Sequence, residues 1–330
     1  MKDQVTFNHD VISRASKYLA DISSVGSYTE SQGIFSVRQE ISQFLQQRDG
    51  YASDPEDIFV TNGASEGVRF CMQTIIRDPS SGFRDGILTP IPQYPLYSAL
   101  TTLLNGQLIP YYLDESKGWT MSTASLTESF NKALESNITP RALVIINPGN
   151  PTGQVLPEDN IREIIQWCRE RNICLMADEV YQENVWESEA RFVSCRKIAF
   201  SEKAFEGPEP LQLISFHSVS KGFMGECGLR GGYFELLGIP SGVKYELLKL
   251  ASISLCSNTI GQIATGIMVQ PPQPGSPSYS TYIAERDQIL DSLRRRANKL
   301  SEALNSLPGV SCTNISGALY AFPSISLPGQ

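Results

Sequence analysis

Apolar and polar residues follow one another along the first two thirds of this chain in blocks that predict strands and helices in turn. Short apolar runs predict strands at residues 58–61, 86–90, 107–113, 141–146 and 173–177, and a buried strand that ends at 211–214. Helical periodicity occupies the intervals and ends near residues 49, 77, 104, 136 and 171. Strands alternating with helices indicate an α/β fold with a mostly parallel sheet between two helical layers, an α/β/α arrangement.

The last quarter of the chain has a different pattern. A proline-rich stretch at 271–277 cannot continue a helix or a central strand and predicts a linker. A long amphipathic helix is expected at 280–307, followed by strands at 310–313 and 318–325. We therefore expect a large domain over 26–270, and a linker with part of a smaller α+β domain over 271–330. The opening segment, 1–25, is expected to associate with that smaller domain.

Composition narrows the class of protein. The 330 residues carry a net charge of −8, which argues against nucleic acid as a main partner because phosphate backbones require a basic face. No apolar run approaches the ~20 residues that span a bilayer. Seven scattered cysteines favour reduced thiols, and two histidines are too few for a histidine-built metal site. We expect an intracellular protein of the cytoplasm, with mitochondria left open and with no membrane or metal partner.

Candidate chemistry concentrates at residues 215–232, directly after the apolar run 211–214. Lys221 follows a core strand, where an unpaired ammonium is costly, so its amine is expected to lose a proton readily and attack a carbonyl to form a Schiff base. Five glycines, the Ser218 hydroxyl and the Arg230 guanidinium suit a phosphate group. An aldehyde and a phosphate occur together in pyridoxal 5′-phosphate, and the hypothesis is that the chain binds this cofactor.

Three polar residues that follow predicted strands, two after 173–177 and one after 141–146, extend this hypothesis. Asp178 would face the pyridine nitrogen and keep it protonated, so that the ring accepts electrons. Tyr181 and Asn150 would donate hydrogen bonds to the 3′ oxygen of the cofactor. Taken singly, each residue also fits a structural role, as a helix cap, a half-buried tyrosine and a turn asparagine.

Further candidates would hold the ring and the phosphate. Tyr94 is the candidate to stack on the ring, and a core aromatic between two prolines is the alternative. Ser65 and the backbone N–H groups of Ala64 and Ser65 start a helix after a strand and a glycine turn, which is an anion-binding arrangement. Ser218 and Arg230 would hold the phosphate from the other side. Lys221 would carry a proton to and from the substrate Cα.

These motifs resemble the fold-type I, class I and II aminotransferases, and more narrowly the alanine aminotransferases. The most selective segment is Ser-Phe-His-Ser-x-Ser-Lys-Gly-x-Met-Gly-Glu-Cys-Gly-x-Arg-Gly-Gly at 215–232. Further segments similar to that family lie at 31–33, 92–97, 147–153 and 271–275. The resemblance runs from about residue 7 to the end of the chain and implies a central sheet of the pyridoxal-phosphate transferase type.

The resemblance also implies a reaction and the role of each residue. L-Alanine and 2-oxoglutarate would give pyruvate and L-glutamate in ping-pong half-reactions, with Lys221 as the Schiff-base lysine and Asp178 and Tyr181 as its catalytic companions. The implied cofactor-binding residues are Ala64, Ser65, Tyr94, Asn150, Asp178, Tyr181, Ser218, Lys221 and Arg230. Tyr28 would reach the phosphate of a neighbouring subunit, which implies a homodimer.

Family members are longer at both ends, and their arginine for the substrate carboxylate lies beyond residue 330. No residue here is assigned that role, so the expectation is that these 330 residues bind the cofactor and turn over substrate poorly or not at all. Two alternatives stay open: another fold-type I enzyme, such as a lyase or decarboxylase, and a non-catalytic homologue that acts as a binding subunit.

Overall fold

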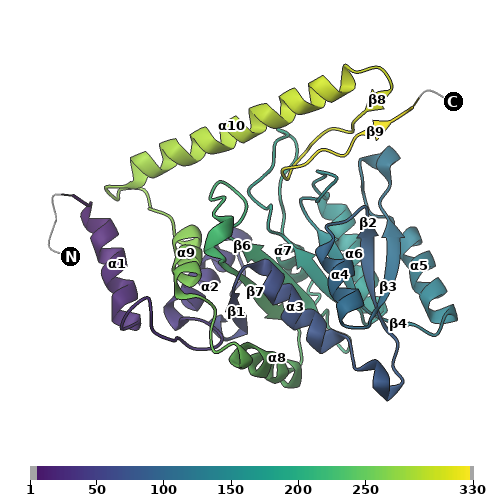
Figure 1. Ribbon diagram of the computed structural model, residues 1–330, viewed down its shortest axis with the longest axis horizontal. Coiled ribbons are helices and arrows are strands. Elements are labelled where there is room, and N and C mark those ends of the chain that lie inside the picture. The colour runs from purple at the N-terminus through teal and green to yellow at the C-terminus, as the bar shows by residue number, and fades with distance from the viewer. Residues whose placement is uncertain (1–5, 328–330) are drawn as a thin grey trace.

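The computed structural model of the chain describes residues 6–327 and places a seven-stranded sheet at its centre (Figure 1). The strands of the sheet are β1 (Ile58–Thr61), β2 (Asp85–Ile91), β3 (Gln107–Tyr112), β4 (Thr139–Ile146), β5 (Cys174–Asp178), β6 (Leu213–Ser218) and β7 (Gly232–Leu237). Their order is β1-β7-β6-β5-β4-β2-β3. Pairing is parallel from β3 through β6, and β7 runs antiparallel to both β6 and β1. The mostly parallel sheet is confirmed.

Successive side chains of the central strands belong alternately to two separate hydrophobic cores, one on each face of the sheet. On β4, Leu143 and Ile145 enter one hydrophobic cluster, whereas Val144 enters the other. On β5, Leu175 joins the first cluster and Met176 the second. Successive side chains of a strand point to opposite faces, so a strand that is apolar throughout is covered on both sides. The predicted three-layer arrangement follows from this pattern.

Helices of both layers cover these faces. The ten α-helices of residues 6–327 are α1 (His9–Asp21), α2 (Phe35–Asp49), α3 (Ala64–Ile75), α4 (Leu96–Leu103), α5 (Thr123–Glu135), α6 (Glu158–Glu170), α7 (Cys195–Ser201), α8 (Ser241–Ile253), α9 (Thr259–Val269) and α10 (Tyr279–Asn305). Helices α5, α6 and α7 contribute to the first core, and α3, α4 and α8 to the second. A third cluster joins α1, α2 and α9 to β1 and β7.

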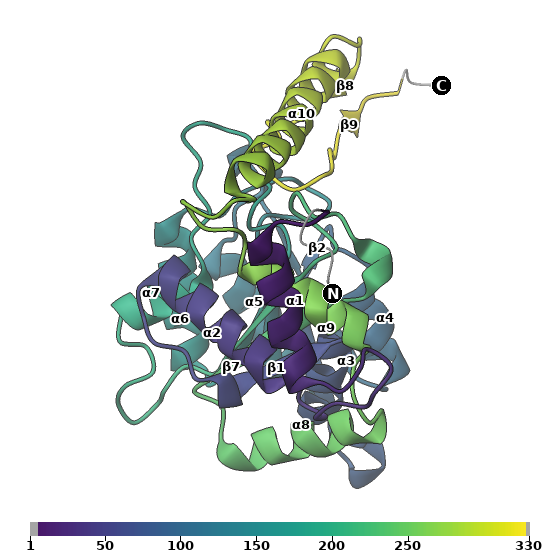
Figure 2. The same cartoon turned by 90° about the vertical axis from the view of Figure 1, so that its left-hand side faces the viewer.

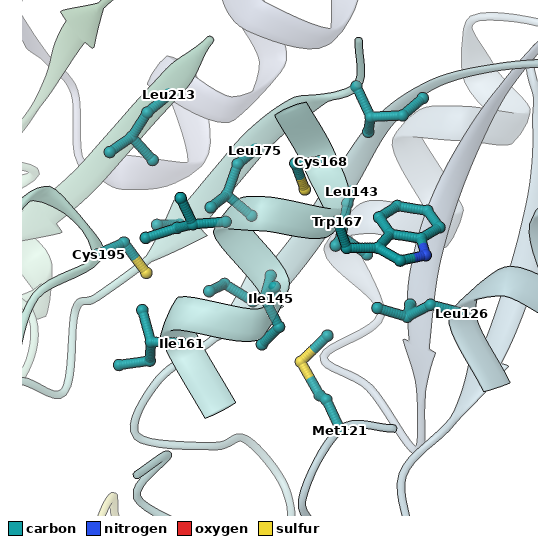
Figure 3. Close-up of a cluster of buried hydrophobic side chains, with 14 of the residues drawn as sticks. Met121, Leu126, Leu143, Ile145, Ile161, Trp167, Cys168, Leu175, Cys195 and Leu213 are labelled. Carbon is teal, nitrogen blue, oxygen red and sulfur yellow. The ribbon is translucent and has the colours of Figure 1, made fainter. Parts of the chain in front are cut away.

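The first core is shown in Figure 3. Leu143, Ile145 and Leu175 of the sheet face Ile161 and Trp167 of α6 there. Ile161, Ile164, Ile165 and Cys168 repeat at helical spacing, and this apolar stripe is the reason why α6 lies against the sheet. Burial of such large side chains contributes about 1.5–3 kcal/mol each to folding. The rigid sheet that results holds the strand ends, where the candidate residues lie.

Helix α10 and the segments after it stand apart from the sheet (Figure 2). None of the residues of α10, all of which are described, is buried. The structure contains two-residue strands β8 (Val310–Ser311) and β9 (Ser324–Ile325) in place of the longer strands predicted at 310–313 and 318–325. The prediction for 318–325 was wrong because residues 316–318 bond to loops of the large unit and not to a neighbouring strand. The domain boundary at residue 271 stays a prediction.

One further boundary differs from expectation. The buried strand was predicted to end by Ile214, but β6 continues to Ser218. Ser215 and His217 are polar yet buried, because side chains cover them on the face of the sheet: Ser215 bonds to buried Glu179, and His217 lies against the rings of Phe44 and Tyr233. All seven cysteines are free, as expected. Within residues 6–327, no helix combines the length and the apolarity that crossing a membrane requires.

Candidate active site

Nine of the ten predicted site residues line one cavity at the carboxyl ends of the strands. The cavity has a volume of about 180 Å³. Its wall contains Ala64, Ser65, Tyr94, Asn150, Asp178, Tyr181, Ser218, Lys221 and Arg230. In open α/β sheets, ligands bind at this edge, and here residues up to 166 positions apart (230 − 64) converge on it. The structure therefore brings the predicted site together.

Strand alternation selects the side chains that reach this cavity. Asp178 is the fifth residue of β5 and shares the sheet face of Met176, beneath α3 and α4. Ser218 ends β6 on the same face as Phe216. The next residue after Asp178, Glu179, points to the opposite face, where it accepts a hydrogen bond from the backbone of α7. Asp178 and Ser218 are consequently neighbours at one edge of the sheet.

Asp178 is a buried carboxylate with a defined set of donors. Its Oδ2 accepts a hydrogen bond of 2.7 Å from the hydroxyl of Tyr97, and its Oδ1 accepts a longer one from the N–H of Val180. Burial raises the pKa of Asp178, whereas the bond from Tyr97 and the nearby charge of Lys221 lower it. A cationic partner in the cavity would stabilise the carboxylate further.

Sequence reasoning missed Tyr97. It lies on α4, three residues after Tyr94, and is fully buried. Burial, followed by the charge of Asp178, raises its pKa, so it remains a donor. Tyr94 precedes α4, which begins at Leu96, so no helical spacing relates the two tyrosines and the local sequence does not mark Tyr97.

Three further groups meet beside the carboxylate. The Nδ2 of Asn150 donates a hydrogen bond of 3.3 Å to the hydroxyl of Tyr181. The Nζ of Lys221 lies 5.2 Å from the centre of the Tyr181 ring. Burial raises the pKa of Tyr181, and therefore its phenol keeps its proton at neutral pH. The cavity thus holds an amine, a phenol and an amide close to one acid.

The loop that carries Lys221 is held by Asn184, which the sequence did not single out. The side chain of Asn184 is fully buried and bonds to both backbone groups of Gly222. Its Oδ1 accepts from the N–H at 2.9 Å, and its Nδ2 donates to the carbonyl at 3.3 Å. These two hydrogen bonds hold Gly222 and thereby restrict the backbone of Lys221, the residue before it.

The opposite end of the cavity is an anion-binding cup. Helix α3 begins at Ala64, so the first N–H groups of the helix point toward the cavity without helical partners. The guanidinium of Arg230 donates to the Oγ of Ser65 at 3.2 Å and to the backbone carbonyl of Asn62. Gly63 has φ +80°, and a Cβ added there would collide with the Arg230 guanidinium. Only glycine allows this close approach.

Tyr94 and Tyr28, which were both predicted to contact the cofactor, differ in their position relative to the cavity. Tyr94 is 43% exposed and lies on the cavity wall, so the alternative of a core aromatic is wrong. Tyr28 is 78% exposed and lies outside the cavity, in a loop whose Thr29 bonds to Cys256 before α9 and to Gln262 within it. Within one chain, Tyr28 is therefore not part of the assembled site.

Cavity size alone does not identify the site. A larger groove of about 850 Å³ lies between α1, α9 and the start of α10, and its wall is mainly apolar. It contains none of the ten candidate residues. The smaller cavity has the acid, the amine and the basic cup, and these groups define a reactive centre.

The comparisons with known proteins concern nearly the whole chain. Residues 3–328 match the family described as aminotransferase class I and II. A probable mitochondrial alanine aminotransferase of Dictyostelium discoideum is 52% identical over 97% of this chain and 59% of its own length. A glutamate–glyoxylate aminotransferase of Arabidopsis thaliana is 50% identical over 98% of this chain and 66% of its own length. The chain spans about three fifths to two thirds of these relatives.

Solved structures show the same fold. An aminotransferase from Escherichia coli superposes with a TM-score of 0.77 at 29% identity and covers 94% of this chain and 70% of its own. An alanine aminotransferase from Pyrococcus furiosus gives a TM-score of 0.80 at 24% identity, with 98% and 75% covered.

Proposed function

Because the chain belongs to the aminotransferase class I and II family, we propose that it transfers an amino group from L-alanine to 2-oxoglutarate in two half-reactions, leaving pyruvate and L-glutamate. Relatives about 50% identical to the chain are named alanine aminotransferases. The single observation that carries the proposal is the convergence of Lys221, Asp178 and Arg230 on one cavity at the sheet edge.

The cofactor of this family is pyridoxal 5′-phosphate, and the donor set of the cavity fits it. The cup of Ser65, Ser218, Arg230 and the α3 N-terminus matches a phosphate dianion. Asp178 is the acid that would hold the pyridine nitrogen at the other end. Asn150 and Tyr181 would hold the 3′ oxygen, with Tyr94 against the ring. When bound, the cofactor supplies an aldehyde that condenses with amines and a ring that accepts the electrons of the Cα bond.

The residues of the chain supply acid–base chemistry and orientation. The amine of Lys221 would take the proton from the substrate Cα and return it to the product, and its position beside Tyr181 and near the charge of Asp178 supports this role. The carboxylate of Asp178 cannot rotate freely because Tyr97 fixes one of its oxygens. Dipoles that are already oriented in a site of low dielectric need little reorganisation when charge develops during the reaction.

Glyoxylate is a second candidate acceptor. Two relatives at 49–50% identity are named glutamate–glyoxylate aminotransferases. Glyoxylate carries a hydrogen on its carbonyl carbon where pyruvate carries a methyl group, so a site that accepts pyruvate has room for glyoxylate. The relative rates with pyruvate and glyoxylate, each with glutamate as donor, distinguish the two activities.

A homodimer is the proposed functional unit. Tyr28, Ile253, Leu255 and Ile260 are large apolar side chains more than half exposed, and they lie on neighbouring segments. Asn258, at the start of α9, bonds to the carbonyl of Arg230 and so links this apolar patch to the phosphate cup. Sedimentation velocity tests the dimer. Mixing Tyr28→Ala and Lys221→Ala subunits should restore one intact site per mixed dimer, and no restoration would contradict a shared site.

We propose a cytoplasmic location and keep mitochondria as the alternative, since three relatives are named mitochondrial and others carry no compartment in their names. Fractionation of cells that express the tagged natural protein tests this assignment.

A single-turnover experiment tests the reaction itself. The protein loaded with pyridoxal phosphate is mixed with L-alanine, and pyruvate is measured against bound cofactor. One equivalent of pyruvate, with conversion of the cofactor to its amine form, is the result that the proposed function predicts, and it would overturn the sequence-based expectation that these 330 residues turn over substrate poorly or not at all. Release of carbon dioxide or of a side-chain fragment would indicate a decarboxylase or a lyase. Binding of the cofactor with no reaction of any amino acid would indicate a binding subunit.

A further inference from the structure

A segment close to the C-terminal end of the described residues lies against both loops that build the cavity. The N–H of Gly317 donates to the carbonyl of Gly153 at 2.7 Å. The N–H of Ala318 donates to the carbonyl of Asn184 at 2.9 Å, and Trp186 bonds to the same segment through its backbone and its indole. Gly153 follows Asn150 in one loop, and Asn184 follows Tyr181 in the other. The segment 316–320 therefore joins the two loops.

The sequence of this segment fits the close contact. A Cβ on Gly317 would come within 2.8 Å of the Asn184 carbonyl oxygen and within 3.0 Å of Pro148, so a larger residue would displace the segment. Ala318 is completely buried and packs with Val180 and Tyr181. These contacts fix the backbone from which Tyr320 extends.

Tyr320 contacts the site through Tyr181. The Tyr181 hydroxyl donates a hydrogen bond of 3.1 Å to the Tyr320 hydroxyl oxygen, and the two rings meet edge to face, with centroids 5.9 Å apart and planes at 82°. Among the described residues that form the cavity wall, Tyr181 is present and Tyr320 is not. Tyr320 consequently supports the Tyr181 phenol from behind.

The number of protons on the two phenols limits which hydroxyl group can donate in the contact between Tyr181 and Tyr320. A phenol has one proton to donate and accepts through its oxygen. In this structure Tyr181 accepts from Asn150 and donates to Tyr320. When the Tyr181 proton turns into the cavity instead, the bond between the two phenols persists only if the Tyr320 hydroxyl rotates and becomes the donor. A chain of hydrogen bonds in this direction strengthens each donor in turn.

On this basis, and resting on the proposed function, we propose that Tyr320 is a positioning residue that aims the Tyr181 hydroxyl into the cavity by donating a hydrogen bond to it. The contact would make the segment 316–320 part of the machinery that tunes the cofactor, although it is 139 residues away from Tyr181 in the chain.

The test uses Tyr320→Phe, which keeps the ring contact and removes only the hydroxyl. Pyridoxal phosphate is bound to the parent and the variant, and the absorption band is followed against pH. A weaker hydrogen bond from Tyr181 to the 3′ oxygen stabilises the deprotonated form of the bound cofactor less. The pH at the midpoint of the spectral change should therefore rise by about 0.3–1 unit in the variant. In a Tyr181→Phe background, Tyr320→Phe should cause no further shift.

The controls separate the possible failures. Tyr112→Phe, which changes an exposed tyrosine on β3, should leave the midpoint unchanged. The urea unfolding midpoint of the unloaded proteins establishes that Tyr320→Phe folds. An unshifted band in a folded, loaded Tyr320→Phe variant overturns the role of Tyr320, and so does an equal shift in the Tyr181→Phe background. Absence of any band in the parent overturns the proposed function and this role with it.

Discussion

The hydroxyl of Tyr97 donates a 2.7 Å hydrogen bond to Oδ2 of Asp178, and both side chains are buried, with Asp178 in the wall of the cavity and Tyr97 behind it. Tyr97 comes from the first turn of α4, and Asp178 is the last residue of β5. Oδ1 accepts only the 3.4 Å bond from the N–H of Val180 and has room for a partner in the cavity. The bond from Tyr97 opposes the effect of burial, which raises the pKa of Asp178, so α4 favours the charged form of the acid and orients it.

Tyr97→Phe removes this bond and keeps the ring. The pKa of Asp178 should then rise and its carboxylate should lose a fixed orientation, so that pyridoxal phosphate binds about 10-fold more weakly, the expected cost of one hydrogen bond to a charged group. A fluorescence titration with the cofactor measures the change. Tyr112→Phe, on the exposed side of β3, is the matched control. Equal affinities of parent and Tyr97→Phe would contradict a role for Tyr97.

Gly63→Ala tests the phosphate cup. Gly63 has φ +80°, and an added Cβ would push the Arg230 guanidinium away from Ser65. We expect the affinities for pyridoxal phosphate and for inorganic phosphate to fall by at least about 10-fold, because a charged donor is displaced. Gly118→Ala is the matched control, since its φ is +67° and open space surrounds it. Both variants carry the backbone strain of about 1 kcal/mol, but only Gly63→Ala should lose phosphate binding.

The stability of the protein should depend on pH through Glu179. Burial raises the pKa of this carboxyl from 4.5 to about 7, and the charge of Asp49 adds to the effect, whereas Arg48 and the N–H of Cys195 oppose it. Between pH 4.5 and about 7 the folded protein holds a proton that the unfolded chain has lost. The contribution of Glu179 to the free energy of unfolding therefore decreases as the pH rises, by on the order of 3 kcal/mol over this window.

The comparison with Glu179→Gln isolates this contribution. Buried His217, whose pKa is lowered to about 3, has the opposite dependence and is present in both proteins. The free energy of unfolding of Glu179→Gln relative to the parent should therefore increase from pH 4.5 to 7. Urea unfolding at pH 4.5, 5.5, 6.5 and 7.5 measures this difference. A difference that stays constant over the range would show that Glu179 has an ordinary pKa.

Strand ends are the part of the site that the sequence reveals. Lys221, Asp178 and Asn150 each follow an apolar run, and parallel strands place such residues at one edge of a sheet. The central parallel strands were predicted for the same reason, since apolar runs bounded by turns are strong local signals. Antiparallel β7 was missed, because its run is interrupted by Glu235, which is buried beside Arg196.

Tyr97, Asn184 and Tyr320 could not be predicted from local pattern. Each acts through a partner that the fold brings near it, such as Asp178 for Tyr97, and nothing in the neighbouring sequence marks that partner. The long strand predicted at 318–325 was wrong for a related reason, since residues 316–318 exchange backbone bonds with loops at least 130 residues earlier. Tertiary contacts override local propensity at these positions.

The central claim is that the amine of Lys221 binds pyridoxal phosphate covalently. The purified protein is incubated with the cofactor, reduced with borohydride and digested, and the peptides are weighed by mass spectrometry. We predict an absorption band that reduction abolishes, and one phosphopyridoxyl group on the peptide that contains Lys221, with neither in Lys221→Ala. Labelling of another lysine in the parent, or an equal yield of labelled protein from Lys221→Ala, would contradict the account.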